Sequence, residues 1–305
     1  MPANTHLAHL SDTLLVWAVF GYAAAMLGYA AEFAFGRRSG TGSPRAERAG
    51  RAAVVLTVLA WAVHVGSVVT RGFAAHRVPW GNMYEFSSMV SLVAVTVFLV
   101  LLKRSNARFL GAFVMAPVVL YLGLAGTVLY AKAGPLVPAL NSYWIKIHVV
   151  AAITASGAFM VSGVVTVLYL LKERFERRTS LGPGTASVTE FSGAGLMRWL
   201  PAADKLDRIA HRIITFAFPV WTFAIIAGAI WAEQAWSRYW GWDPKETWSF
   251  ITWLAYAAYL HARATAGWRG RRAAVLSLIG FACLMVDYYV VNTVITGLHS
   301  YAGVS

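Results

Sequence analysis

The sequence predicts an all-α, polytopic membrane protein with about eight transmembrane helices and both termini outside the cytoplasm. Of its 305 residues, 58% are hydrophobic and only 13% are charged. Apolar runs long enough to cross a bilayer recur along the whole chain. The N-terminus lacks the Lys/Arg cluster of a signal peptide, so we expect the first apolar run to be a retained span. Residues 1–305 are therefore expected to form a single integral membrane domain.

Each apolar run has about the length that a bilayer requires of a helix, roughly 20 residues. We expect the spans at residues 14–35, 52–70, 86–102, 109–130, 148–171, 212–231, 247–263 and 273–296. The longest polar interruption, residues 172–211, is rich in Gly, Ser and Thr near its centre. We expect it to be a flexible cytoplasmic loop.

The distribution of basic residues predicts the orientation in the membrane. The loops at residues 36–51, 103–108, 172–212 and 263–272 carry twenty of the 26 Lys and Arg residues, and the opposite loops carry six. The positive-inside rule places the more basic set in the cytoplasm. The net charge of +13 is then a topology signal, and nucleic acid is not needed to explain it. We expect a multi-pass protein of the cell (cytoplasmic) membrane.

This topology brings four stretches to the extracytoplasmic face, namely residues 76–85, 135–146, 231–248 and 297–301. The most unusual is 231–248, which holds five tryptophans in eighteen residues. An aromatic belt at the membrane interface would explain scattered tryptophans, but not this density directly before a helix start. Asp243 can cap a helix, Glu246 can complete a capping box, and Pro244 suits the first helical position. The sequence therefore predicts an aromatic loop anchored to the seventh span.

Two histidines lie at the outer boundary, His148 at the start of span five and His299 at the end of span eight. Each alone is more often a hydrogen-bonded interfacial residue than a metal ligand. Together, and beside a tryptophan-rich loop, they suit haem, because neutral imidazole is a common axial ligand and a porphyrin stacks on aromatic faces. We therefore expect His148 and His299 to bind haem iron on the extracytoplasmic face.

The loop supplies further candidates for contact with the porphyrin. The indoles expected to shelter it are Trp236, Trp240, Trp242 and Trp248. Arg238 and Lys245 could pair with the propionates, and Arg77 and Lys146 lie on the same side. Asp243 and Glu246 are expected to hold the haem-binding loop on span seven rather than to act as acid or base. No catalytic residue is assigned.

Two more histidines lie inside predicted spans. His261 is about 26 Å along the helix from Pro244, near the cytoplasmic leaflet, and His64 lies within span two. Ionisable groups inside spans either serve function or bridge helices, so His261 and His64 are candidate metal ligands. Asp287, in span eight, could pair with a histidine or with Arg71.

These residues together resemble the CcsA/ResC family of cytochrome c biogenesis proteins, part of a haem-handling superfamily that carries a WWD domain. The resemblance covers most of the chain, and the tryptophan segment is its most specific part. The matching segments are Trp240–Trp248, Ile251–Leu254, Tyr259–His261, Pro138–Leu140, Ser142–Trp144, Asn82–Glu85 and Gly297–Tyr301, together with His148. One departure is Ser237-Arg238, where the family usually has a glycine and a small residue.

The resemblance implies that His148 and His299 ligate haem above the tryptophan loop and that His261 holds haem on its way across the membrane. It also implies a separate membrane partner of the ResB (CcsB-type) family. The pair would act as the System II cytochrome c synthase, a haem lyase that joins the vinyl groups of haem b to the thiols of a Cys-x-x-Cys-His apocytochrome c. A thiol-reducing membrane system is a further expected partner.

Two other functions remain open on the residues alone. A b-type haem electron-transfer subunit would hold haems between paired histidines inside neighbouring spans, whereas the best pair here lies at helix ends. A membrane solute transporter would show inverted repeats and broken helices near the midplane, and neither is clear in this sequence. Redox activity with a quinol would favour the first, and solute uptake without bound haem would favour the second.

Overall fold

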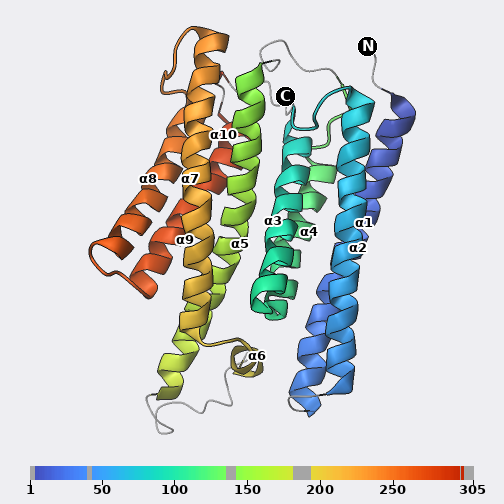
Figure 1. Cartoon of the computed structure of the whole chain (residues 1–305), viewed down its shortest axis with the longest axis vertical. Helices are drawn as coiled ribbons and strands as arrows, with labels where there is room; N and C mark the ends of the chain where they lie inside the picture. Colours follow the sequence, from blue (N-terminus) through green and yellow to red (C-terminus); the bar gives the residue numbers. More distant parts are fainter. Residues whose placement is uncertain (1–3, 40–42, 135–141, 181–193, 296, 299–305) are drawn as a thin grey trace.

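The computed structural model describes residues 4–39, 43–134, 142–180, 194–295 and 297–298, and these residues form helices without strands (Figure 1). The elements are α1 (Thr5–Ser39), α2 (Pro44–Ala75), α3 (Met83–Ser105), the 3₁₀ turn η1 (Arg108–Leu110), α4 (Gly111–Thr127), α5 (Tyr143–Ser180), α6 (Ala194–Trp199), α7 (Ala203–Trp236), α8 (Pro244–Ala264), α9 (Arg271–Met285), the π-helical turn η4 (Val286–Val290) and α10 (Val291–Thr293). The predicted all-α class is confirmed.

In the described part of the chain, seven helical segments are long and apolar enough to cross a membrane, judged by length and composition. They are α1, α2, α3, η1–α4, α5, α7 and α9–α10. The chain is therefore a multi-pass membrane protein. Helix α8, expected as the seventh of eight spans, is not among these segments, and it packs against α7 and α9. Its crossing of the bilayer stays a prediction.

Helix α5 lies at the centre of the bundle and is the most buried of the candidate spans. On one side of it, α3 and α4 lead to the pair α1 and α2, and on the other side lie α7, α8 and α9 (Figure 1). The α1–α2 pair is in close contact because Gly21 and Gly28 face alanines of α2. A Cβ atom at Gly21 would lie 2.8 Å from the Cβ of Ala60. Small residues let membrane helices approach in this way.

The segment 172–211, expected to be a flexible loop, is mostly helical where the structure describes it. Helix α5 continues to Ser180, α6 spans Ala194–Trp199, and α7 begins at Ala203. The extension of α5 has a physical reason in its charge pattern, because Lys172 pairs with Glu176 and Arg177 pairs with Glu173 four residues apart. Most of the Gly/Ser/Thr-rich stretch, residues 181–193, lies outside the described residues.

Both ends of the described chain lie at the end of the bundle that carries the α7–α8 loop (Figure 1). The Asn4 N–H donates to the carbonyl of Ala74, at the end of α2, over 2.9 Å. The Leu298 N–H donates to Asp243 in the α7–α8 loop over 2.8 Å. The two ends thus share one side of the bundle, and the assignment of that side to the cell exterior stays a prediction.

Candidate functional site

A large cavity opens at this end of the bundle, where the loop before α3 and helices α3 and α4 face α5, α7, α8 and α9. Its empty volume is about 1280 Å³, counting the part open to solvent. Its wall is mostly apolar and aromatic, with a few polar groups, as is usual for ligand pockets. Along α5, the lining begins at Ile145 and reaches Ser156, which is about 16 Å along the helix axis.

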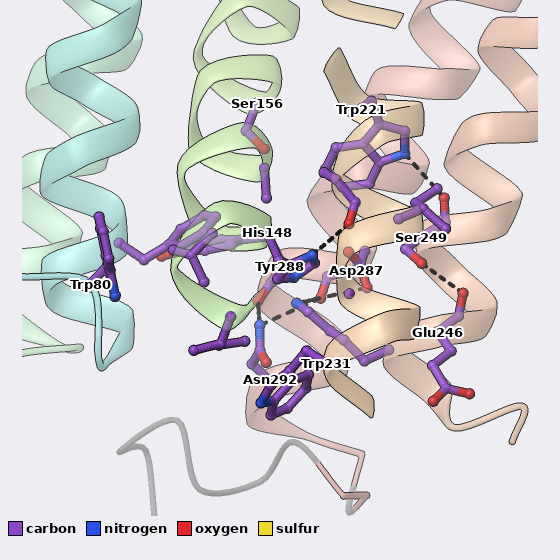
Figure 2. A pocket seen from close by; sticks show the side chains of 18 of the residues that line it. Trp80, His148, Ser156, Trp221, Trp231, Glu246, Ser249, Asp287, Tyr288 and Asn292 are labelled. Atoms are coloured by element: carbon purple, nitrogen blue, oxygen red, sulfur yellow. Dashed lines mark hydrogen bonds and ion pairs between the residues drawn. The ribbon is translucent and has the colours of Figure 1, made fainter. Parts of the chain in front are cut away.

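His148, on the second turn of α5, lines this cavity (Figure 2). Its Nδ1 contacts the carbonyl oxygen of Ala224 on α7 at 2.7 Å. A carbonyl oxygen only accepts, so Nδ1 carries the proton and Nε2 carries the lone pair of the neutral ring. Metal-binding histidines are commonly oriented by such a hydrogen bond to the second ring nitrogen.

Gly228 permits this approach of α5 to α7. A Cβ atom at Gly228 would lie 2.7 Å from Nδ1 and 2.9 Å from Cε1 of His148. Real Cβ contacts are essentially never that short, so any larger residue here would have to move the imidazole. The sequence thus places a glycine where the ring of His148 meets the neighbouring helix.

Five tryptophans line the cavity, and three of them belong to the predicted segment 231–248: Trp231 and Trp236 at the end of α7 and Trp240 in the α7–α8 loop. The rings of Trp231 and Trp236 meet edge to face, with centroids 4.8 Å apart. Trp242 is not a lining residue, and its side chain is 66% exposed. Its ring makes edge-to-face contacts with the rings of Trp240 and Phe250. Trp248, on α8, also lies outside the lining. The structure therefore brings Trp236 and Trp240 to the cavity, but not Trp242 or Trp248.

The loop itself is shorter than the predicted segment 231–248, because α7 continues through Trp236 and α8 begins at Pro244. Ser237 ends α7 with a φ angle of 54°, and Trp242 has a φ of 59°. This left-handed region favours glycine and is rarely adopted by tryptophan. Ser237 occupies the position at which we noted the departure from the family's usual glycine.

The predicted helix start is confirmed. Asp243 and Glu246 form a capping box, and Pro244 is the first residue of α8. The second carboxylate oxygen of Glu246, Oε2, accepts hydrogen bonds from the backbone N–H groups of Gly241 at 2.8 Å and Asp243 at 3.1 Å. The two carboxylates therefore hold the loop on α8, as the sequence indicates.

Asp243 also anchors the C-terminal segment. Its Oδ1 accepts the Leu298 N–H at 2.8 Å, and a Cβ at Gly297 would lie 2.9 Å from the same oxygen. The residue before His299 is thus tied to the tryptophan loop. His299 itself lies outside the described residues, so its role as a ligand stays a prediction.

The Lys and Arg residues expected to pair with the propionates lie in different surroundings. Lys245 lines the cavity, and its Nζ donates to the Asp287 carbonyl at 2.8 Å. Burial lowers the pKa of the Lys245 ammonium, and the nearby Asp287 carboxylate acts in the opposite direction. Arg238 is exposed on the loop and does not line the cavity. Arg77 binds Glu85 through Nη1 at 2.7 Å and Nη2 at 3.1 Å.

The predicted partner of Asp287 was a histidine or Arg71, whereas the structure pairs it with Lys245, Nζ to Oδ1, at 3.7 Å. Arg71 instead contacts Glu85 at 3.1 Å and Asp12 at 3.4 Å. Sequence distance explains the difference, because the start of α8 and the π-helical turn after α9 meet only in the folded bundle.

The remaining candidate histidines lie away from the cavity. His64 is fully buried, and it hydrogen-bonds Tyr22 through Nδ1 at 3.2 Å and Ser88 through Nε2 at 2.9 Å. It therefore bridges α1, α2 and α3. His261 is exposed in the last turn of α8. Within the described residues there is no cluster of three or more His, Cys, Asp or Glu side chains that could hold a metal ion.

Several lining residues had not been selected from the sequence, notably Trp80, Trp221 and Tyr239. The indole of Trp221 donates to the Ser249 carbonyl at 3.2 Å, as drawn in Figure 2. Residues 221, 224, 225, 228 and 232 recur on one helical face of α7. That periodicity identifies a buried face of α7, but it does not show that this face borders a cavity.

Comparison with known proteins shows the family to which the chain belongs. Residues 80–299 match the family described as cytochrome c assembly protein. The cytochrome c biogenesis protein CcsA of Synechococcus elongatus is 36% identical over 287 residues, covering 83% of this chain and 86% of that protein. CcsA of Porphyra purpurea is 32% identical over 97% of this chain and 98% of that protein, and CcsA of Gloeobacter violaceus is 35% identical over 79% and 83%. The chain belongs to the cytochrome c assembly protein family and acts in cytochrome c biogenesis as a haem-handling membrane protein.

Proposed function

We propose that this chain binds haem b in the cavity and presents it for covalent attachment to apocytochrome c, as a subunit of a System II cytochrome c synthase. The observation that carries the proposal is the imidazole of His148, oriented by α7 inside a cavity that indoles line and that holds an ammonium group. These are the groups that an iron porphyrin with two propionates needs.

His148 and His299 are the proposed axial ligands. The hydrogen bond that Nδ1 of His148 donates to the Ala224 carbonyl leaves Nε2 as the proposed metal-binding nitrogen. The bond between Asp243 and Leu298 supports the second ligand, because it holds the chain one residue from His299 beside the tryptophan loop. A site with two imidazole ligands would take one histidine from α5 and one from the C-terminal segment that follows Leu298.

The walls of the cavity suit the rest of the ligand. Trp231, Trp236 and Trp240 offer aromatic surface to the porphyrin, and Lys245 is placed to pair with a propionate. Arg238, exposed on the adjacent loop, is a second proposed partner for a propionate. Asp243 serves by fixing the loop, and Trp242 contacts the ring of Trp240 from outside the cavity lining.

Bound haem supplies the vinyl carbons to which cysteine sulfur atoms add, and each thiol hydrogen passes to the other vinyl carbon, so no leaving group is formed. This chain contributes the position of the haem. Correct placement of two reactants can supply about 7–11 kcal/mol of the activation barrier. The loop anchored by Asp243 and Glu246 is suited to that role because its backbone is held by several hydrogen bonds.

His261 is the proposed haem contact within the membrane. Because its side chain is exposed on α8, a neighbouring membrane protein can reach it, and we propose a ResB-type partner at this position. The other proposed partners are apocytochrome c and a thiol-reducing membrane system. The site would face the exterior of the cell membrane, as the distribution of basic residues indicates.

The test is to purify the chain with its partner and record the Soret band and haem content of His148→Ala. His9→Ala is the matched control, because His9 is exposed at the same end of the bundle and outside the cavity. We expect loss of haem and a changed Soret band in His148→Ala alone. An unchanged spectrum and haem content in that variant would remove His148 from the site.

A further variant tests the route across the membrane. His261→Ala should lower the haem content of the outer site, and added imidazole should partly restore it. Normal cytochrome c maturation in His261→Ala would exclude this residue from the route.

A further inference from the structure

The contact between Lys245 and Asp287 has two components. The ammonium donates a hydrogen bond to the backbone carbonyl of Asp287 at 2.8 Å, while the nearest carboxylate oxygen, Oδ1, lies 3.7 Å away. The second distance is within reach of charge attraction but too long for a hydrogen bond. The backbone carbonyl therefore positions the lysine, and the carboxylate neutralises it.

The π-helical turn Val286–Val290 makes this arrangement possible. In a π turn the backbone bonding shifts by one residue, which turns carbonyl groups away from the regular helix ladder. Here the Asp287 carbonyl accepts from Lys245, and the Tyr288 carbonyl accepts from the Asn292 side chain at 2.5 Å. All four residues line the cavity, and Figure 2 shows Asp287, Tyr288 and Asn292 at its wall. Such turns occur often at functional sites.

The other charged residues of the lining cannot take over the roles of Lys245 and Asp287. Among the described lining residues, Lys245 is the sole Lys or Arg, and the acidic residues are Glu246 and Asp287. Glu246 is occupied in capping α8 through the N–H groups of Gly241 and Asp243. A ligand carboxylate that enters the cavity must therefore compete with Asp287 for Lys245.

We propose that Asp287 is an internal competitor that weakens haem binding and speeds haem release. This proposal rests on the proposed function, since it takes an anionic tetrapyrrole as the ligand. Two carboxylates that share one ammonium repel each other, and at a separation of about 5 Å and an effective dielectric constant of about 20 this repulsion is worth a factor of roughly 250 in affinity. A protein that must pass its haem to an acceptor gains from such a limit on affinity.

The experiment measures the rate at which haem leaves the purified complex of this chain and its partner, using excess apomyoglobin as the acceptor. Asp287→Asn retains the backbone carbonyl that holds Lys245, and we expect it to slow release at least about tenfold. Lys245→Met should accelerate release. With haem dimethyl ester, which has no propionate charge, both variants should release at nearly the wild-type rate.

Asp12→Asn is the matched control. It removes a carboxylate that neighbours Arg71 at the same end of the bundle but outside the cavity, and it should leave release unchanged. Unchanged or faster release of haem from Asp287→Asn, or equal effects on haem and its dimethyl ester, would overturn the proposal. Failure of the proposed function gives a different result, since haem binding would then not depend on His148 in the wild-type background.

Discussion

The close approach of α7 to His148 makes Gly228→Ala the sharpest perturbation of the site. The added Cβ would lie 2.7 Å from Nδ1, whereas ordinary contacts begin at 3.4 Å. The ring must therefore move by about 0.7 Å, or α5 and α7 must separate by that amount. Either movement disturbs the hydrogen bond between Nδ1 and Ala224, which measures 2.7 Å.

The loss of that bond and the displacement of Nε2 should together cost about 1–3 kcal/mol of haem binding, which is roughly a 5- to 150-fold increase in the dissociation constant. The assay is a haem titration of the purified complex, followed by the Soret band, with the unfolding temperature measured on the same sample. Gly126→Ala is the matched control, because a Cβ at that helical glycine has nothing within 4 Å.

We expect Gly126→Ala to bind haem like the wild type and to gain up to about 1 kcal/mol of stability, since alanine favours a helix more than glycine. Gly228→Ala should bind haem weakly while it remains folded. Wild-type affinity and spectrum in a folded Gly228→Ala would refute the reasoning, because they would show that the orientation of His148 by α7 is irrelevant to the site.

Other perturbations address the loop. Asp243→Ala removes the cap of α8 and the acceptor for Leu298, so it should cost about 0.5–2 kcal/mol of stability and also lower haem content; a normal haem content would count against the anchoring of the C-terminal segment. Ser237→Gly relieves the left-handed residue at the end of α7 and should stabilise the fold by roughly 0.5–1 kcal/mol in thermal unfolding, and a lower unfolding temperature would contradict this. Trp236→Ala should speed haem release several-fold through loss of roughly 1 kcal/mol of aromatic contact, whereas Trp242→Ala should not, and the reverse order would contradict the cavity wall described here.

Much of the architecture follows from periodic or local signals in the sequence. Apolar runs of bilayer length predict the helices, and the spacing of Asp243, Pro244 and Glu246 predicts a helix start that the structure contains. These signals depend on a few neighbouring residues, so no tertiary information is needed. The extent of helices into charged flanks is less predictable, because ion pairs such as Lys172–Glu176 extend α5 past its apolar part.

The composition of the cavity wall depends on contacts between distant segments, and there the sequence is less informative. His148, Trp236, Trp240 and Lys245 were expected at the site and line the cavity. Trp242 was expected there too, but its left-handed backbone lies outside the lining and its ring is exposed. The pairing of Lys245 with Asp287 could not be predicted, since it depends on the π-helical turn and on the packing of α8 against that turn.

The most direct test of the central claim is whether residue 148 supplies an axial ligand to haem iron. The near-infrared magnetic circular dichroism of ferric low-spin haem reports the two axial atoms, so the purified complex can be compared with His148→Met. We predict the band of two imidazole ligands in the wild type and that of one imidazole and one thioether in the variant. The same band in both proteins would contradict the claim, because the iron would then be bound by groups other than His148.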